Sequence, residues 1–543
     1  MSIAELYVKK YGPLIGLAAL IWLVFGQAVN FDFLFWDDYV HIVSNPHLQM
    51  PLWPWSNIRW IFSFDTSMRF EPVTWLGHVL ICAIFTKNPG AYHFCLIILH
   101  FINSLLVYKL CLRILSKFAT DDVPREAIAF LGSAFWALNA VRVEPLGLSA
   151  DLGYPLATFF VLSSFSFYLI SINQGRLKWS PYFFSFVLNG LAVCTWPISV
   201  GFAFCLPFFD RIFFPAETAH RWDRHSTGFV AYWASRIAFA FPSLASGLAM
   251  VSARFHPVGT YALGLRPVSP LNTIRLMHGA YAWVYIYLHQ FWPFGLTPGH
   301  YPWPHSGFHA VYLLSLFCLL GAAMAAWRSR SSTAWALLAA SACLAGPMFG
   351  LTEEPTTPVD RYSYLPNAFS ALLLAWAMSR FWMYHLGSWS TRVALYAGMS
   401  FIPIIGLQSH RQLQIWQSSY TLFAYLKTTP EIRSQPYLQY HIDNLMAGQL
   451  VAYGDFNSAL HIYEALTRYV PNNYQYWRSL GLVAHLLGKD SEALKAFNAE
   501  YAIDRSPETR AIIQSIENNR QPNEAEARGN RTESPGNSHA HGP

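Results

Sequence analysis

Charged residues are scarce in this chain of 543 residues, and their scarcity excludes a single soluble domain. Asp, Glu, Lys and Arg make up only 12% of the sequence, whereas hydrophobic residues make up 54%. This balance is typical of a protein that crosses a membrane several times and carries a smaller soluble part. The net charge of +6 is small and spread through loops, so nucleic acid is not indicated as a partner.

Cysteine and the common catalytic motifs are also sparse. The seven cysteines lie in or beside apolar segments and form no Cys-x-x-Cys pair, which indicates packing thiols. The sequence has no Gly-rich nucleotide-binding loop, no serine nucleophile elbow and no His-Glu-x-x-His motif. None of the chemistries that depend on those motifs is therefore indicated.

Long apolar runs, in contrast, are abundant. About eleven are long enough to span a bilayer, while two others, 73–86 and 276–296, are predicted to lie on its outer surface. With the N-terminus inside, basic residues such as Lys9, Arg125 and Arg328 fall repeatedly on the inner side. The predicted spans are 13–32, 91–112, 126–144, 153–172, 180–196, 197–214, 228–251, 308–327, 333–352, 364–384 and 391–408.

Acidic residues gather on the opposite, outer side of this predicted membrane. The doublet Asp37-Asp38 begins the first outer loop, Glu71 precedes a surface helix, and Glu144 and Asp151 flank a turn between two spans. Carboxylates beside a bilayer are costly to keep charged unless water, a cation or a polar substrate meets them. Their placement predicts a functional site, although a solvated loop, a helix cap or an ion pair with arginine would explain each acid structurally.

Arginine and tyrosine side chains are predicted on the same outer side. Transfer of a group from a lipid phosphate to a hydroxyl needs a carboxylate to accept a proton and cations to neutralise the phosphate. Arginine suits the second task because its planar fork holds phosphate oxygens and stays charged. A structural pair between Asp360 and Arg361 is the alternative for that arginine. The candidates for contact with a donor lipid phosphate are Arg142, Arg275, Arg361, Tyr362 and Tyr364.

The chain after residue 412 is polar, and it contains a repeat. The segment that starts at Gly454 (GDFNSALHIY) matches the one that starts at Gly488 (GKDSEALKAF), an offset of 34 residues. This is the period of tetratricopeptide repeats, so a helical solenoid is predicted over 413–517. The remaining segment, 518–543, lacks periodicity and is predicted to be disordered.

The order of these motifs resembles the GT-C glycosyltransferases, most closely the transmembrane-and-tetratricopeptide relatives of protein O-mannosyltransferases. The resemblance covers nearly all of a membrane domain, 1–412, in which 33–90 forms the first outer loop with interfacial helices. It implies an α-helical GT-C bundle of about 11 spans before the solenoid. The matching stretches are Trp36-Asp-Asp-Tyr39 to Pro46, Phe70-Glu-Pro72, Asn88-Pro-Gly90 to His100, Arg142-Val-Glu144 to Asp151, and Asp360-Arg-Tyr-Ser-Tyr-Leu-Pro366.

The resemblance also implies roles for particular residues. An acid of the first outer loop, Asp37 or Asp38, would act as catalytic base, and the sequence does not choose between them. Glu71, Glu144 and Asp151 would support the acceptor or a metal, with Asp38 and Glu144 as candidate ligands of a divalent ion. The chain departs from its relatives at Ala150 and Trp196, where they often carry basic residues.

The predicted function is transfer of a sugar such as mannose, with inversion, from a polyprenyl-phosphate carrier to Ser or Thr of an exported protein. The repeats would bind that protein. The predicted location is a bacterial inner membrane, with the N-terminus cytoplasmic and the active site and repeats periplasmic. Two alternatives stay open: the same fold glycosylating a lipid or envelope glycan, and a non-catalytic scaffold that acts through its repeats.

Overall fold

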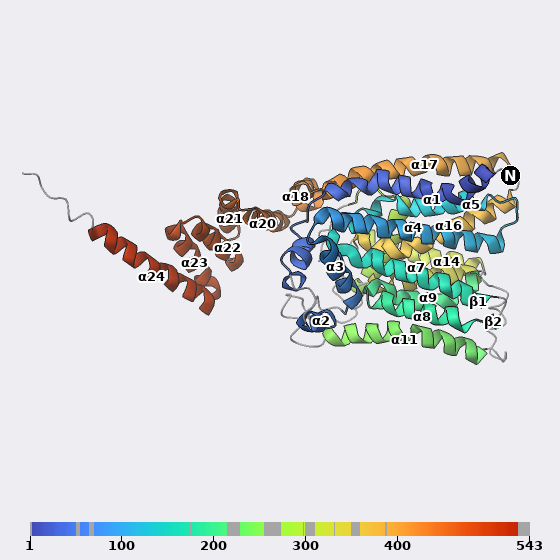
Figure 1. Ribbon diagram of the computed structural model, residues 1–543, viewed down its shortest axis with the longest axis horizontal. Coiled ribbons are helices and arrows are strands. Elements are labelled where there is room, and N and C mark those ends of the chain that lie inside the picture. Colours follow the sequence, from blue (N-terminus) through green and yellow to red (C-terminus); the bar gives the residue numbers. More distant parts are fainter. Residues whose placement is uncertain are drawn as a thin grey trace, which may run out of the picture. The chain divides into compact units, whose positions relative to one another are not determined.

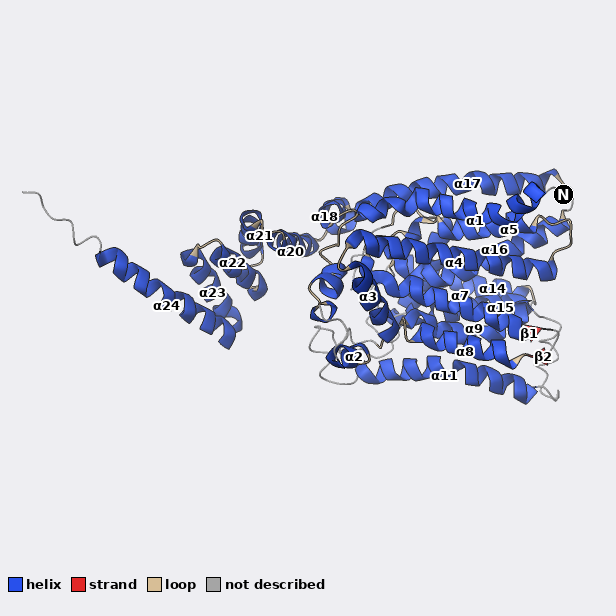
Figure 2. Ribbon diagram, in the orientation of Figure 1, coloured by secondary structure: helices blue, strands red, loops and turns tan. Residues whose placement is uncertain are grey.

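The computed structural model describes residues 3–49, 55–63, 70–173, 176–213, 229–254, 273–296, 298, 310–330, 332–348, 359–385 and 388–529. These residues are mostly helical, and their one β pairing is a short hairpin of β1 (Ile172–Asn173) with β2 (Arg176–Leu177) (Figure 2). The α-helical class predicted from the sequence is confirmed. The chain separates into two units, Met1–Leu426 and Lys427–Pro543.

Among the described residues of the first unit, five helical stretches are long and apolar enough to cross a membrane, in agreement with the membrane character predicted from composition. They are fewer than the eleven predicted spans. Several predicted spans form helices of only 12 to 15 residues, such as α9 (Phe202–Phe213) and α8 (Trp179–Val193). The five stretches are Tyr11–Asn30, Pro89–Ser116, Ser149–Ser171, Ala310–Arg328 and Trp389–Trp416.

The long helices of the first unit run beside one another (Figure 1). The N-terminus and the β hairpin lie at one end of this bundle. Helices α2 (Trp55–Ile61), α3 (Pro72–Phe85) and α18 (Ser419–Thr428) lie at the other, which we call the site end. Besides α8 and α9, the bundle contains α1 (Ile3–Phe25), α4 (Pro89–Phe118), α5 (Arg125–Ala137), α7 (Gly153–Ser171), α11 (Phe229–Arg254), α14 (Ala310–Arg328), α15 (Ser332–Ala345), α16 (Tyr364–Tyr384) and α17 (Trp389–Leu413).

Short helices replace regular helix at the site end because polar and proline residues interrupt the apolar runs. Helix α5 ends at Ala137, and the side chain of Asn139 accepts a hydrogen bond from the backbone N–H of Val141, which starts a new turn. The predicted span 126–144 is therefore helical only in part, and Glu144 lies in the separate helix α6 (Glu144–Gly147). Further short turns are η2 (Tyr39–Val43), η3 (Pro46–Leu48), η4 (Ala140–Arg142), η5 (Ser149–Leu152), η6 (Pro197–Gly201) and η8 (Asp360–Ser363).

Helix α13 (Thr273–Phe291) contacts residues near the site end along much of its length. The ring of Tyr281 packs against Tyr312, in the first turn of α14. The hydroxyl of Tyr285 donates to Asp360, and the side chain of Gln290 donates to the carbonyl of Phe135, near the end of α5. These contacts place α13 at that end of the bundle, beside the segments that carry the predicted site.

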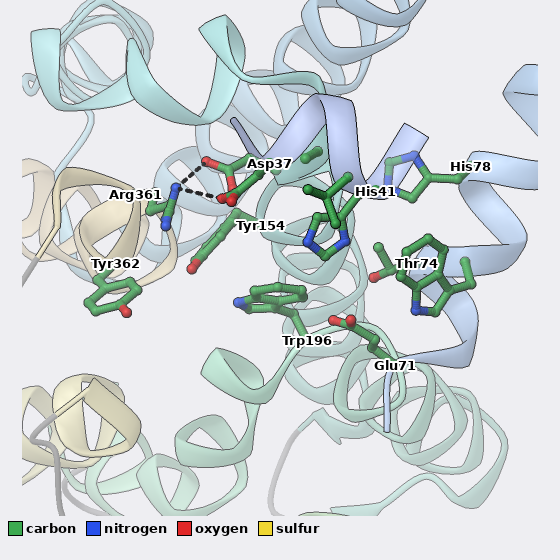
Figure 3. A pocket seen from close by; sticks show the side chains of 13 residues that line it. Asp37, His41, Glu71, Thr74, His78, Tyr154, Trp196, Arg361 and Tyr362 are labelled. Atoms are coloured by element: carbon green, nitrogen blue, oxygen red, sulfur yellow. Dashed lines mark ion pairs between the residues drawn. The ribbon is translucent and has the colours of Figure 1, made fainter. Parts of the chain in front are cut away.

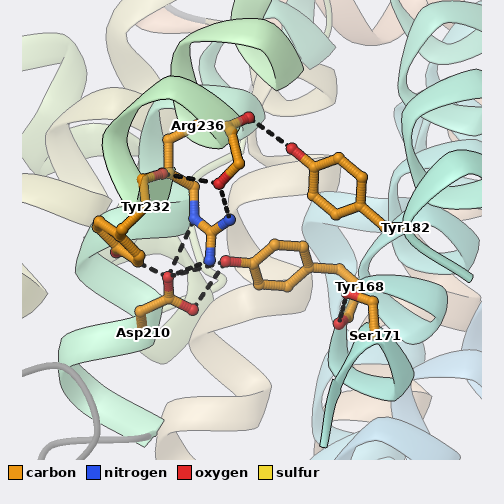
Figure 4. Close-up of polar contacts among 7 residues, drawn as sticks. Tyr168, Ser171, Tyr182, Asp210, Tyr232 and Arg236 are labelled. Carbon is orange, nitrogen blue, oxygen red and sulfur yellow. Dashed lines mark hydrogen bonds and ion pairs between the residues drawn. The ribbon is translucent and has the colours of Figure 1, made fainter. Parts of the chain in front are cut away.

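A buried polar cluster joins three helices in the interior of the bundle (Figure 4). Asp210 on α9 and Arg236 on α11 form an ion pair of 2.9 Å, and both side chains are only 4% exposed. The hydroxyls of Tyr168 on α7 and Tyr232 on α11 each donate to the Asp210 carboxylate at 2.8 Å. Because each charge has partners, the cluster fixes α7, α9 and α11 relative to one another.

The second unit is a series of antiparallel helix pairs. Helices α20 (Pro436–Ala452) and α21 (Phe456–Tyr469) are joined at Gly454, and α22 (Tyr474–Leu486) and α23 (Asp490–Asp504) are joined at Gly488. Both glycines have positive φ, +82° and +71°, which explains why glycine recurs there. Gly481 of α22 lies so close to the ring of Phe497 that a Cβ atom would meet it at 2.8 Å.

The last helix, α24 (Pro507–Gly529), differs from the prediction for the C-terminal segment. The sequence predicts disorder from residue 518, but the helix continues as far as Gly529, because Glu, Gln, Ala and Arg of this segment are good helix formers. Residues 530–543 of the predicted tail lie outside the described residues.

Candidate active site

A cavity of about 390 Å³ opens at the site end of the first unit (Figure 3). Its walls come from segments far apart in the sequence: the loop after α1, the start of α3, the turn before α7, the turn before η6, and η8. The described residues that line it are Asp37, Val40, His41, Glu71, Thr74, Trp75, His78, Ala150, Asp151, Tyr154, Trp196, Arg361 and Tyr362.

One arginine lies among three carboxylates at the wall of this cavity. Nη1 of Arg361 is 3.8 Å from Oδ2 of Asp37, 3.4 Å from Oε1 of Glu144 and 3.5 Å from Oδ2 of Asp151. The Arg361 backbone N–H also donates to Oε2 of Glu144 at 3.0 Å. We call these four residues the acid–arginine cluster, because they bring together groups that are up to 324 positions apart in the chain.

The three acids of this cluster differ in exposure. The side chains of Glu144 and Asp151 are only 3% and 6% exposed, whereas that of Asp37 is 36% exposed. Burial raises the pKa of Glu144, and the nearby Arg361 opposes that rise. Asp37 is therefore the most accessible acid of the cluster, while Glu144 and Asp151 hold the guanidinium, although Asp151 also reaches the cavity wall.

Asp38 has a different environment from its neighbour Asp37. Its side chain is buried, and it accepts hydrogen bonds from the backbone N–H of Ala150 at 2.6 Å and of Leu34 at 3.1 Å. Burial raises the pKa of Asp38 to about 7, although these two hydrogen bonds favour the charged form. The geometry thus assigns Asp38 to joining the loop after α1 with the turn before α7, and leaves Asp37 facing the cavity.

Glu71 is held at the cavity by the start of α3. Pro72 suits the first position of that helix, because a backbone N–H there would have no partner within the helix and the φ of proline is already helical. The backbone N–H of Val73 donates to the carbonyl of Cys194 at 3.1 Å, and Oγ1 of Thr74 donates to that of Thr195 at 2.6 Å. These bonds attach the start of α3 to the turn that carries Trp196, so Glu71 and Trp196 line one cavity.

Two residues predicted to bind phosphate lie outside the cavity wall. Arg142 is fully buried, donates from Nη2 to Oε1 of Gln290 at 3.0 Å, and lies over the rings of Trp136 and Tyr364. The hydroxyl of Tyr364 is 2.6 Å from Nδ1 of His100. Both residues therefore pack in the bundle interior, as Asp360 does when it accepts the hydroxyl of Tyr285 at 2.6 Å.

The other predicted phosphate contacts have different placements. Tyr362 lines the cavity next to Arg361. Arg275 lies in the first turn of α13, and its side chain is outside the described part of the structure. Among the described lining residues, Arg361 is the sole Lys or Arg, so recognition of an anion at this cavity would depend on it.

The described residues show no group of three or more His, Cys, Asp and Glu side chains arranged to hold a metal ion. Of the two candidate ligands, Asp38 accepts two backbone hydrogen bonds and Glu144 is bonded to Arg361. Neither candidate therefore belongs to a metal-binding group among the described residues.

In the aromatic part of the wall, Tyr362 was predicted from the sequence as a phosphate contact, whereas Tyr154, Trp75 and His41 were not singled out. The ring centroids of Tyr154 and Trp196 are 4.9 Å apart, and those of Tyr154 and Tyr362 are 6.3 Å apart. On the other side of the cavity, His41 stacks on Trp75 at 5.7 Å. Gly153 is the one local sequence feature that relates to this wall. A Cβ atom at that position would lie 2.5 Å from the Trp196 ring, so glycine allows the ring to pack close to the backbone of α7.

Comparison with known proteins finds no matching family, no matching curated protein and no matching solved structure. The geometry supplies an accessible carboxylate, an adjacent arginine and an aromatic wall within one cavity.

Proposed function

We propose that this protein is a membrane glycosyltransferase of the GT-C type, which transfers a sugar such as mannose from a polyprenyl-phosphate carrier to Ser or Thr of an exported protein. The acid–arginine cluster at the cavity carries this proposal. Within 4 Å of Nη1 of Arg361 lie carboxylate oxygens of three acids, which come from two other segments of the chain: Asp37, Glu144 and Asp151. A purely structural pair would need only one of these acids.

Asp37 is the catalytic base in this proposal. Its carboxylate accepts the proton of the acceptor hydroxyl while that oxygen forms a bond to the anomeric carbon. The bond from the anomeric carbon to the phosphate oxygen breaks, and its electron pair leaves with the lipid phosphate. Because the attacking oxygen enters opposite the departing phosphate, the configuration at the anomeric carbon inverts.

Arg361 stabilises the charge that develops on the phosphate. A guanidinium stays protonated near a membrane and offers several N–H donors in one plane, so it can contact carboxylates and a phosphate together. The nearby acids raise the pKa of Arg361 further, which keeps the charge in place. Glu144 and Asp151 are positioning residues, because they hold Arg361 beside Asp37.

The proposed topology follows the alternation of basic and acidic residues in the sequence. The shorter helices of the bundle cross the membrane with the five long ones, for about 11 spans, and the site end faces away from the cytoplasm. The N-terminus is cytoplasmic, and the second unit and the cavity are periplasmic in a bacterial inner membrane. Helix α13 and α3 would lie at the outer surface, where a lipid-linked donor presents its head group.

The second unit is proposed to be a tetratricopeptide-type solenoid that binds the exported protein. The 34-residue offset between Gly454 and Gly488, and the contact of Gly481 with Phe497, support this assignment. Stacked helix pairs of this kind present a surface suited to extended or helical peptides, so the unit would select acceptors without taking part in the chemistry.

The test is a transfer assay with purified full-length protein in lipid nanodiscs. Polyprenyl-phosphate mannose and a Ser/Thr-rich peptide serve as substrates, and mass spectrometry measures the added hexose. We expect Asp37→Asn to lower the transfer rate by about 100-fold or more, since general base catalysis contributes 10²–10⁴-fold. Asp32→Asn is the matched control, because Asp32 lies in the same loop with an exposed side chain outside the cavity lining.

The outcomes separate the alternatives. Transfer to a lipid or envelope glycan but not to the peptide would favour the second acceptor class. In cells, mass spectrometry of exported proteins should show a hexose on Ser or Thr that disappears with Asp37→Asn and with deletion of 436–543. A phenotype lost on that deletion but unchanged by Asp37→Asn would contradict catalysis and favour a scaffold.

A further inference from the structure

The side of the cavity formed by α3 has no role in the proton transfer or phosphate binding described above. It carries Trp75 and His78, which are three positions apart on one face of the helix and both line the cavity. The two residues are only 2% and 1% exposed. Nε1 of Trp75 and Nδ1 of His78 are buried, and neither has a hydrogen-bond partner in the described part of the structure.

Neighbouring rings hold both side chains in one orientation. The ring of Trp75 packs edge-on against that of Trp60 at 4.7 Å between centroids, and it is stacked with His41 at 5.7 Å. His78 stacks on Tyr92 at 5.9 Å, and its ring lies 5.6 Å from that of Trp75. The two hydrogen-bonding groups therefore have fixed positions before a ligand arrives, which lowers the entropy cost of binding.

An indole and a neutral imidazole favour a particular kind of ligand group. The Nε1–H of Trp75 can only donate, whereas a neutral imidazole has one nitrogen that donates and one that accepts. His78 is neutral at pH 7, because burial lowers its pKa to about 3. An anion would lose its hydration beside these two groups without gaining a cation, and a cation could not accept from the indole. A neutral group that both accepts and donates a hydrogen bond, such as an amide or a hydroxyl, suits the pair.

The position of Trp75 and His78 in the cavity indicates which substrate they meet. Figure 3 shows Arg361 and His78 on opposite sides of the cavity, with Asp37 between them. In the proposed reaction, the donor phosphate lies at Arg361 and the acceptor hydroxyl lies at Asp37. The rest of the acceptor therefore extends away from Arg361, toward α3. In a peptide acceptor, the groups next to a Ser or Thr hydroxyl are backbone amides, each with one C=O acceptor and one N–H donor.

We propose that Trp75 and His78 bind a backbone amide of a peptide acceptor, with the indole N–H donating to the amide carbonyl and an imidazole nitrogen accepting from the amide N–H. This inference rests on the proposed function, for which it gives the chemical group that identifies the acceptor. The two residues determine specificity, since they contact the acceptor beside the reacting hydroxyl but take no part in the proton transfer.

The experiment measures amide binding directly, without transfer. Full-length protein in nanodiscs is titrated with N-acetylthreonine N-methylamide, and binding is followed by saturation-transfer NMR. This probe has the acceptor hydroxyl and two amides, but it lacks the length of the extended or helical peptides that a helical solenoid binds. Trp75→Phe and His78→Leu should each weaken its binding about 3- to 10-fold, because each variant removes one hydrogen bond.

Conservative and control variants, together with a second probe, complete the test. His78→Gln keeps a donor and an acceptor, so it should retain most of the amide binding. Trp179→Phe is the matched control for Trp75→Phe, since Trp179 is 72% exposed and follows the β hairpin at the other end of the bundle. Binding of methyl mannoside should be the same in wild type, Trp75→Phe and His78→Leu. Weaker binding of the mannoside with unchanged amide binding would assign the two residues to the sugar and overturn the proposal.

The amide subsite and the proposed transferase can fail separately. In the transfer assay, Trp75→Phe should raise KM for the peptide about 3- to 10-fold with little change in kcat, since the amide contact is the same before and during the reaction. If wild-type protein binds no amide, or the variants bind it as wild type does with the same elution profile, the subsite falls even if transfer is observed. If the amide binds as expected but wild-type protein transfers no sugar, the subsite stands and the proposed function falls.

Discussion

Replacement of Arg361 by glutamine tests whether the positive charge of Arg361 stabilises the folded protein by compensating the buried acids of the acid–arginine cluster. The substitution removes the cation but keeps a polar side chain, and it leaves Glu144 and Asp151 with side chains only 3% and 6% exposed. Removal of one partner of a buried ion pair typically costs about 3–5 kcal/mol, because the remaining charge loses its compensation. We expect a loss of that size in the free energy of unfolding at pH 8.

The loss should depend on pH in a defined direction. Burial already raises the pKa of Glu144 in the folded state, so protonation of Glu144 favours folding. The stability that protonated Glu144 contributes is present below pH 4.5, and it is lost as pH rises through the folded-state pKa. Without Arg361 this folded-state pKa rises further. The variant should therefore approach wild-type stability near pH 4–5 and fall increasingly below it toward pH 8.

The assay is equilibrium unfolding in mixed micelles with increasing sodium dodecyl sulfate at several pH values. Arg125→Gln is the control, because Arg125 pairs with Asp121, whose side chain is fully exposed, and such pairs contribute about 0–1 kcal/mol. A stability of Arg361→Gln equal to wild type at pH 8, or a loss that does not change between pH 5 and pH 8, would refute the reasoning.

Three further predictions concern stability. Asp38→Ala should lower the unfolding free energy by about 1–3 kcal/mol in the same micelle assay, because two buried N–H groups lose their acceptor. The difference in unfolding free energy between wild type and this variant should shrink as pH rises through about 7, where the buried Asp38 of the wild type becomes charged. Asp210→Asn should cost about 3–5 kcal/mol and Asp210→Leu with Arg236→Met much less, since the double change removes both buried charges. Gly481→Ala should cost about 1–3 kcal/mol through its clash with Phe497 and speed hydrogen exchange in α22 and α23; exchange equal to wild type would show that the ring moves aside.

Helical class and membrane character were predictable because they depend on local properties. Apolar runs and a low charge content do not change with tertiary contacts, so composition alone indicated a membrane-crossing helical chain. The ends of helices were less predictable. The sequence could not show that α5 stops at Ala137, because the break depends on Asn139 capping a turn at the site end.

The acids of the candidate site were predictable from the sequence, but which side chains face the cavity and which pack in the bundle was not. Sequence order and motif resemblance singled out Asp37, Glu144, Asp151 and Arg361. In the folded chain, a carboxylate oxygen of each acid lies within 4 Å of Nη1 of Arg361. The same reasoning expected Arg142 to face the phosphate, yet its side chain packs in the bundle interior. Side-chain direction depends on packing between helices, which residue type alone does not specify.

The sequence by itself determined a helical chain of membrane character, an acidic loop after the first apolar run and a repeat of 34 residues, because periodicity, charge and hydrophobicity are properties of short segments. Tertiary structure alone decided which of two adjacent aspartates meets the cavity. Asp37 and Asp38 have the same chemistry and neighbouring positions, but only Asp38 lies where the backbone N–H groups of Leu34 and Ala150 converge. That convergence joins segments more than a hundred residues apart, and no local pattern encodes it.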